Sequence, residues 1–223
     1  MSASLNSVWP VPQPVSHPGR FISLSPLDVE RDGDELFALS HGDEKRHDLW
    51  RYLPIGPFPH AEAMRVFLRD LRAMPGLVPF TVRETATGRC LGSLSIMSIR
   101  SEHGVAELGY VWYGPAAQRT KANTESCYLL LRYCFDVLGY RRMEWKCNAL
   151  NTPSQAAALR MGFQPEGVFR QHMVVKGENR DTSWFSMLDH EWPLRRANFE
   201  KWLYEDESVS LSQLNRTAGV GSV

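Results

Sequence analysis

The middle of the chain alternates apolar and polar residues in three consecutive stretches, which is the period of strands with one buried face. The stretches are PFTVRE (79–84), RCLGSLSIMSIR (89–100) and VAELGYVWY (105–113). The short segments TATG and EHG separate them, and links of this kind favour tight turns. We therefore predict an antiparallel meander of three strands.

Segments on both sides of the meander repeat their apolar residues at helical spacing. Helices are predicted over 28–42, 60–74, 123–138, 152–162 and 193–203, and further strands over 20–27, 141–150, 163–175 and 181–192. A meander followed by strand–helix–strand units predicts an α+β fold, with a mixed sheet and helices on both faces. The sheet has to change from antiparallel to parallel near Tyr113, and ligands favour such a change of direction.

The stretch NALNTPSQAAALRMGF (148–163) contains a short helix with a strong start and a strong stop. Thr152 and Gln155 have the spacing of a capping box, and Pro153 falls at the first helical position. Gly162 can take the left-handed conformation that ends a helix. The first turn of this short helix is polar, which makes it a candidate for binding or catalysis.

Composition and charge narrow the function. The 25 Lys and Arg residues balance the 25 Asp and Glu residues, so the chain lacks the basic field needed for binding nucleic acid or an anionic membrane. No secretory leader and no run of about 18 apolar residues is visible, which predicts a cytoplasmic protein. The four cysteines, Cys90, Cys127, Cys134 and Cys147, lack zinc-type spacing, which predicts buried, reduced thiols and no metal site.

Three stretches resemble the GCN5-related N-acetyltransferases (GNAT), and within them the ribosomal-protein N-terminal acetyltransferase branch of RimJ and RimL type. They are AELGYVWYGPAAQRTKANTES, ALNTPSQAAALRMGFQPEGVFRQHMVVKG and NRDTSWFSMLD. The resemblance covers residues 20–192. It implies a GNAT domain there, preceded by a proline-rich extended arm (1–19) and followed by a C-terminal helix and flexible tail (193–223).

The resemblance implies that acetyl-CoA binds where two parallel strands part, between the strand ending at Tyr113 and the strand before Asn148. The pyrophosphate would lie at the N-terminus of the following helix, where free N–H groups and the helix dipole favour an anion. The family pattern places a glycine where this chain has Lys121 and a small residue where it has Asn123. Arg119 and Lys121 can offset the lost glycine by pairing with phosphate oxygens, whereas the opposite interpretation is that cofactor binding has decayed. The implied cofactor-binding residues are Val111, Trp112, Tyr113, Gln118, Arg119, Thr120, Lys121, Ala122, Asn123, Thr124, Asn151 and Ser154.

The family motif Asn-x-x-Ser falls on Asn151 and Ser154. The resemblance implies that the asparagine binds the pantetheine arm and that the serine faces the thioester sulfur. A hydroxyl there can donate a proton to the leaving thiolate. The alternative is that Ser154 merely suits a helix N-terminus.

Three routes remain open for the base that takes the ammonium proton. Some ribosomal-type members use a glutamate at the position of Met173, and methionine cannot accept a proton. His172 is adjacent, but strand alternation points it to the opposite face unless the strand contains a bulge. Glu107, in AELGY, is the favoured candidate, and a route through water or the substrate itself is the third. The oxyanion would be met by backbone N–H groups near Val111 to Tyr113.

Between the first two helices, HDLWRYLPIGPF places Trp50, Tyr52 and Phe58 where the family binds its acceptor. An aromatic wall there suits a small or peptide amine. The sequence therefore predicts transfer of an acetyl group from acetyl-CoA to a primary amine of a protein N-terminus, an amino acid or aminoacyl conjugate, or a small toxic amine. The alternative is a non-catalytic acyl-CoA sensor. The arm and the C-terminal helix also leave a homodimer open.

Overall fold

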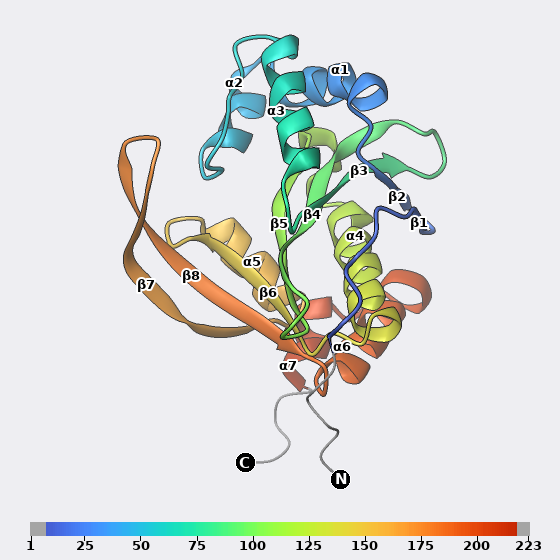
Figure 1. Cartoon of the computed structure of the whole chain (residues 1–223). Coiled ribbons are helices and arrows are strands. Elements are labelled where there is room, and N and C mark those ends of the chain that lie inside the picture. Colours follow the sequence, from blue (N-terminus) through green and yellow to red (C-terminus); the bar gives the residue numbers. More distant parts are fainter. Residues whose placement is uncertain (1–7, 218–223) are drawn as a thin grey trace.

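The structure is a computed structural model that describes residues 8–217. Over these residues the strands form one eight-stranded sheet in the order β1-β2-β3-β4-β5-β6-β8-β7 (Figure 1). The strands are β1 (His17–Pro18), β2 (Ile22–Pro26), β3 (Val78–Glu84), β4 (Cys90–Arg100), β5 (Val105–Tyr113), β6 (Arg142–Asn148), β7 (Gln164–Val175) and β8 (Glu178–Leu188). The predicted meander is the run β3-β4-β5.

Along the chain, helices precede, separate and follow the strands. They are α1 (Val29–Ser40), α2 (Glu44–His47), α3 (Ala61–Ala73), α4 (Lys121–Arg132), α5 (Thr152–Arg160), α6 (Trp192–Glu200) and α7 (Leu211–Thr217). Short 3₁₀ turns are η1 (Asp48–Trp50) and η2 (Pro115–Ala117), and α4 and α6 run on into π-helical turns, η3 (Tyr133–Val137) and η4 (Lys201–Glu205).

Strands β5 and β6 are parallel, whereas the other neighbouring strands of the described sheet are antiparallel. The parallel pairing runs only from Val105 opposite Arg142 to Leu108 opposite Trp145. Both strands continue beyond that point, to Tyr113 and Asn148. The two strands therefore part at the change of direction that the sequence predicts, which confirms the mixed α+β sheet.

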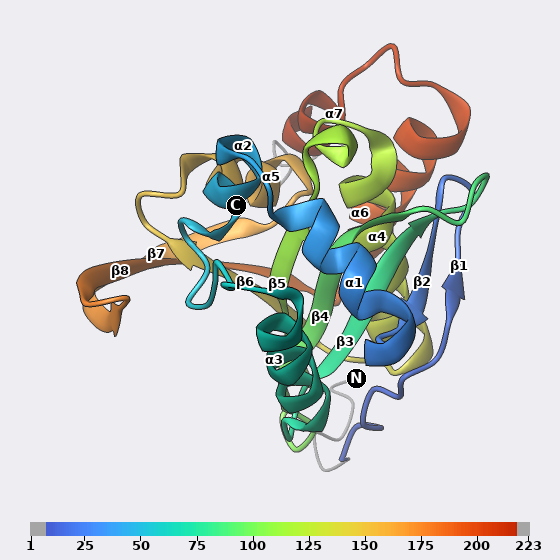
Figure 2. The same cartoon turned by 90° about the horizontal axis from the view of Figure 1, so that it is seen from above.

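Two apolar cores lie on opposite faces of the sheet. The larger joins α4, α5 and the C-terminal helices to one face, and includes Leu130, Met143 and Phe163. The smaller joins α1, α3 and η1 to the other face, around Leu36, Trp50 and Leu68. Seen from above, α1 and α3 cross the sheet on the side away from α4 (Figure 2). On α4 and its continuation η3, the larger core buries the side chains of Cys127, Leu130, Leu131, Cys134 and Phe135.

Helix α3 packs against α1 and the sheet. Its buried residues are Met64, Leu68 and Leu71, whereas the side chain of Val66 on the same helix is 49% exposed.

The start of α5 also differs by one residue. Its N-cap is Asn151, whose side-chain oxygen accepts the N–H of Ser154 at 3.1 Å. Thr152 is the first helical residue and so does not cap, and the amide of Gln155 donates to the carbonyl of Ala149 instead. A polar side chain thus caps the helix, one residue earlier than predicted, and asparagine is at least as good an N-cap as threonine.

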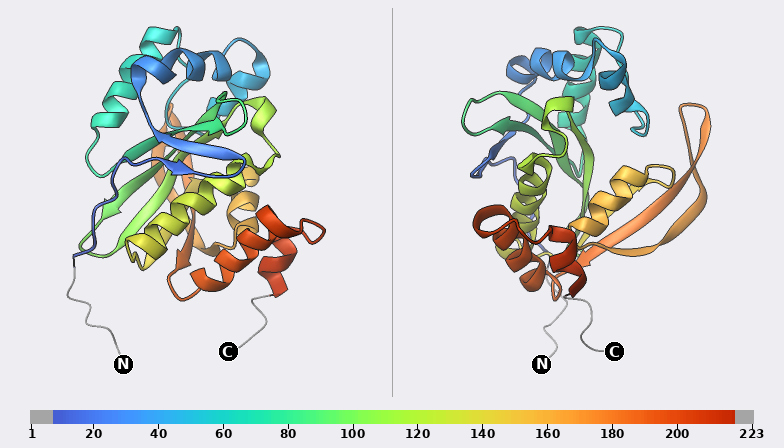
Figure 3. Two further views of the ribbon diagram at one scale, coloured as in Figure 1. Left: turned by 90° about the vertical axis from the view of Figure 1, so that its right-hand side faces the viewer. Right: turned by 180° about the vertical axis from the view of Figure 1, so that it is seen from behind.

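Both ends of the described chain pack against the domain (Figure 3). In the arm, the indole of Trp9 donates to the carbonyl of Gly139. Buried Glu125 on α4 accepts the N–H groups of Phe21 and Ile22 and the hydroxyl of Tyr204. Within the predicted tail, α7 forms over Leu211–Thr217 and buries Leu211. Residues 1–7 and 218–223 of the predicted arm and tail lie outside the described residues.

Candidate active site

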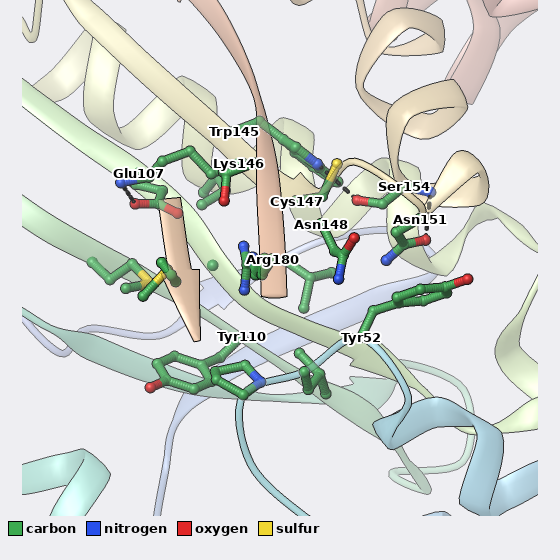
Figure 4. A pocket seen from close by; sticks show the side chains of 18 of the residues that line it. Tyr52, Glu107, Tyr110, Trp145, Lys146, Cys147, Asn148, Asn151, Ser154 and Arg180 are labelled. Carbon is green, nitrogen blue, oxygen red and sulfur yellow. Dashed lines mark hydrogen bonds and ion pairs between the residues drawn. The ribbon is translucent and has the colours of Figure 1, made fainter. Parts of the chain in front are cut away.

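A pocket of about 300 Å³ lies where β5 and β6 part (Figure 4). Strand β5 bends away from β6 because its register with β4 shifts between Ser93 and Ser95, and Tyr110 takes a positive φ of 50°. The pocket is lined by β5, β6, the start of α5, the β7–β8 hairpin and the loop after η1. Its side chains include Tyr52, Glu107, Tyr110, Lys146, Cys147, Asn148, Asn151, Ser154, His172, Met173, Arg180 and Thr182.

Glu107 lies in this pocket as half of an ion pair. Its carboxylate is 2.6 Å from the ammonium of Lys146 and accepts the hydroxyl of Ser98 at 3.0 Å. Burial raises the pKa of Glu107, and the contacts with Lys146 and Ser98 oppose that rise. A buried carboxylate beside one cation, with a pKa above its ordinary value, has the properties of a general base.

Ser154 faces the pocket from the opposite side, at the start of α5. Its hydroxyl oxygen accepts the indole N–H of Trp145 at 3.0 Å, and its hydroxyl also hydrogen-bonds the side chain of Cys147. Burial raises the pKa of the neighbouring Cys147, so that group is a neutral thiol. The side-chain oxygen of Asn151 caps α5, and its amide N–H groups are left to bind a ligand in the pocket.

His172 and Met173 both line the pocket, although they are consecutive residues of one strand. The register of β7 against β8 shifts between Phe169 and Met173, and Gln171 has a positive φ of 49°. This irregularity is the bulge that His172 needed to face the pocket. Its ring Nδ1 lies 3.0 Å from the hydroxyl of Thr182.

The loop before α4 has a helix N-terminus with free donors. Thr120 is the N-cap and takes the N–H of Ala122, so the N–H groups of Lys121 and Asn123 remain. Arg119 is exposed and adopts a φ of 61°, the left-handed region that glycine prefers. The side chain of Gln118 donates to the carbonyl of Tyr113 and so ties the loop to the end of β5.

Lys121 and Thr124 make contacts within the protein. The ammonium of Lys121 donates to the carbonyl of Leu203 and pairs with Glu207 at 3.0 Å. It also lies over the ring of Phe21. Thr124 is fully buried and accepts a hydrogen bond from Arg160. Of the two predicted loop cations, the side chain of Lys121 is thus engaged within the protein, whereas that of Arg119 makes no ion pair or hydrogen bond with residues 8–217.

The predicted aromatic wall is only partly at the pocket. Tyr52 lines it, but Trp50 is 1% exposed and donates its indole N–H to the carbonyl of Ser40. Phe58 packs edge-on against Trp50 at 5.3 Å between ring centres. Trp112 is also buried, 5.5 Å from Trp50, so β5 offers a ligand its backbone at that residue. Trp50 and Phe58 build the floor of the loop that carries Tyr52.

Sequence reasoning missed Lys146, Arg180 and Tyr110. Lys146 follows Trp145 in a buried strand, and an isolated cation in such a strand is itself a sign of a buried charge pair. Its ammonium also lies 4.3 Å from the ring centre of Trp184. The tip of the β7–β8 hairpin is fastened over the pocket, because Lys176 donates to the carbonyl of Trp50 at 2.6 Å.

Three further properties concern residues 8–217 alone. No three His, Cys, Asp or Glu side chains gather there in a way that could bind a metal ion. Helices of the length and apolar character needed to cross a membrane are lacking in this range. The four cysteines are buried and free.

The fold agrees with comparisons to known proteins. A family model described as the acetyltransferase (GNAT) domain matches residues 22–164. The chain therefore belongs to the GNAT acetyltransferases. Its curated relatives are named N-acetyltransferases, and the chain is an N-acetyltransferase of this family. The sensor interpretation is not favoured by these relatives.

One relative is YdaF of Bacillus subtilis, whose name assigns it provisionally to the ribosomal N-acetyltransferases. It is 30% identical over 170 residues, which are 76% of this chain and 90% of YdaF. A GNAT structure from Brucella melitensis is 38% identical with a TM-score of 0.88, and covers 93% of this chain and 97% of its own.

RimJ of Mycobacterium smegmatis, described in complex with CoA-disulfide, shares the fold at 22% identity with a TM-score of 0.71. The match covers 84% of this chain and 93% of RimJ.

Proposed function

We propose that this protein transfers the acetyl group of acetyl-CoA to a primary amine by direct attack of the amine on the thioester. The amine belongs to a protein N-terminus, an amino acid or aminoacyl conjugate, or a small molecule. The observation that carries the proposal is that Glu107 and Ser154 line one pocket from opposite sides of the gap between β5 and β6. A base for the attacking amine and an acid for the leaving thiolate are thus available in one pocket.

The cofactor supplies the activated acetyl group, and the chain offers a matching set of donors. The exposed side of β5 beyond Leu108 is free of β6, so its backbone can pair with the pantetheine amides. The amide of Asn151 adds a side-chain donor, and the N–H groups of Lys121 and Asn123 suit the pyrophosphate. RimJ, which shares the fold, is described with a coenzyme A derivative, and that supports this choice of cofactor.

The residues of the chain then divide the proton transfers. The carboxylate of Glu107 takes a proton from the incoming ammonium, directly or through one water. The backbone N–H groups of Val111 to Tyr113 stabilise the negative charge that develops on the acetyl oxygen. The hydroxyl of Ser154 donates its proton to the departing thiolate, while Trp145 keeps that hydroxyl oriented. His172 is the alternative base, since it also faces the pocket.

A calorimetric titration with acetyl-CoA, followed by thiol release with a panel of amines, tests this function. Micromolar binding with thiol release for one class of amine is expected. Binding without release from any amine would refute transfer to these acceptors, and no binding would refute acetyl-CoA as the cofactor.

The variant Ser154→Ala tests the proton donor. Turnover should fall roughly 10- to 10⁴-fold while acetyl-CoA binding changes little, because the missing group acts on the leaving thiolate. An unchanged turnover would remove Ser154 from the chemistry. Ser101→Ala, in the turn between β4 and β5, is a matched control outside the pocket.

A further inference from the structure

Arg180 brings an uncompensated positive charge to the pocket. Its guanidinium lines the pocket, and its Nε is buried with no hydrogen-bond partner within the described part of the chain. The adjacent carboxylate of Asp181 is engaged elsewhere, where it accepts the backbone N–H of Gln171 and the amide of Asn179. A half-buried arginine without a partner is costly, so its retention here calls for a ligand.

The strand geometry places Arg180 on the side of the reacting base. Lys146 is opposite Trp184 in the pairing of β6 and β8, and side chains two residues apart share a face. Arg180 therefore shares its face with Lys146, which contacts Glu107. Ser154 instead contacts Trp145, the residue before Lys146 on β6, whose side chain lies on the opposite face of the sheet, covered by α5. Figure 4 shows Arg180 between Tyr110 and the end of β6.

The other charges of this face do not neutralise Arg180. The ammonium of Lys146 is paired with Glu107 at 2.6 Å, so these two groups cancel. The phosphates of the proposed cofactor would lie at the N-terminus of α4, beyond the end of β5, and its pantetheine arm is uncharged. The positive charge of Arg180 is therefore available to an anionic group on the acceptor.

We propose that Arg180 binds an anionic group, a carboxylate or a phosphate, on the acceptor amine. This rests on the proposed function and narrows its substrate class to amines that carry an acidic group. A guanidinium suits this task because its planar N–H groups bind such oxygens in pairs. Tyr52 and Tyr110 then border the space between the acidic group and the amine that Glu107 deprotonates.

Paired acceptors separate charge from intrinsic reactivity. L-alanine against L-alaninamide tests a carboxylate, and O-phosphoethanolamine against ethanolamine tests a phosphate. The ratio of kcat/KM within each pair is measured for the wild type, Arg180→Gln, Arg180→Lys and the control Arg170→Gln, whose side chain is exposed on the same hairpin outside the pocket.

We expect the wild type to prefer the anionic member of one pair, and Arg180→Gln to lower its kcat/KM by about 10- to 100-fold through KM. Arg180→Lys should keep part of the preference, and Arg170→Gln all of it. The melting temperature should not fall in Arg180→Gln, because no internal partner is lost. Ratios that are the same in the wild type and Arg180→Gln for both pairs would overturn the proposal.

A second measurement does not need turnover. N-acetyl-L-alanine and its amide are titrated calorimetrically into the wild type and Arg180→Gln. Binding of the acid that is lost in Arg180→Gln supports the proposal even if acetyl-CoA fails to bind, so the two failures are distinguishable. Equal binding of acid and amide in the wild type, together with equal kinetic ratios, would refute it.

Discussion

The ion pair of Glu107 and Lys146 allows the role of the base to be separated from its role in stability. Glu107→Gln keeps the shape of the side chain and removes its charge. Loss of a positioned base is expected to lower kcat/KM by about 10²- to 10⁴-fold, or about 2.7 to 5.5 kcal/mol in the barrier. The acid limb of the pH–rate profile, which lies above the ordinary range of a glutamate because burial raises the pKa of Glu107, should disappear.

The same substitution also leaves Lys146 without its partner. The Glu107 side chain is 6% exposed and that of Lys146 is 19% exposed, so the pair is largely buried. Removing one member of such a pair costs about 3 to 5 kcal/mol of stability, and the partial exposure of Lys146 favours the lower end. The double variant Glu107→Gln, Lys146→Met removes both charges, and methionine can pack against Trp184 where the lysine stem lies.

Thiol-release kinetics and urea unfolding are measured on the wild type, both single variants and the double variant. We expect the double variant to recover stability and to remain inactive, because the base is still absent. Recovery of activity together with stability would refute the reasoning, since Glu107 would then serve only the fold. Full activity of Glu107→Gln itself would favour His172 or a route through water.

Three further predictions concern other parts of the chain. Asn151→Ala removes the N-cap of α5, so it should cost about 0.5–2 kcal/mol in urea unfolding and weaken acetyl-CoA binding in calorimetry; an unaltered affinity would exclude a cofactor contact. Arg119→Gly keeps the left-handed backbone and removes the charge, so the Kd for acetyl-CoA should rise, most at low salt. Lys121→Ala should instead lower Tm, because its contacts with the C-terminal segment are lost. Equal effects of the two variants on Kd would contradict this assignment. Burial lowers the pKa of His17 from 6.5 to about 4, so the unfolded chain binds the extra proton, and stability should fall as pH drops from about 6.5 to about 4. His17→Phe should flatten the dependence of unfolding free energy on pH in this range. A dependence that persists in the variant would assign it to another group.

Much of the fold could be predicted from local pattern. The meander, the helix α4 with its buried face, the short helix α5 and the final hairpin follow from periods of two and 3.6 residues and from turn residues, all of which act over a few positions. The described end of the chain could not be predicted in this way. Leu211 on α7 is buried because α7 packs against α5 and α6, through contacts of Asn215 with the carbonyl of Arg160 and with the guanidinium of Arg195.

For the site, the sequence by itself predicted Asn151, Ser154 and Glu107, because a family motif and an acidic residue in an apolar strand are visible along the chain. Only the tertiary structure decided that Lys146 pairs with Glu107 and that a bulge turns His172 into the pocket. It also decided that Lys121 contacts the C-terminal segment and that the Nε of Arg180 is buried without a partner among residues 8–217. The physical reason is that a side chain's charge partners and its burial depend on strands brought together from distant parts of the chain, whereas hydrophobic period and helix capping depend on residues within a turn or two.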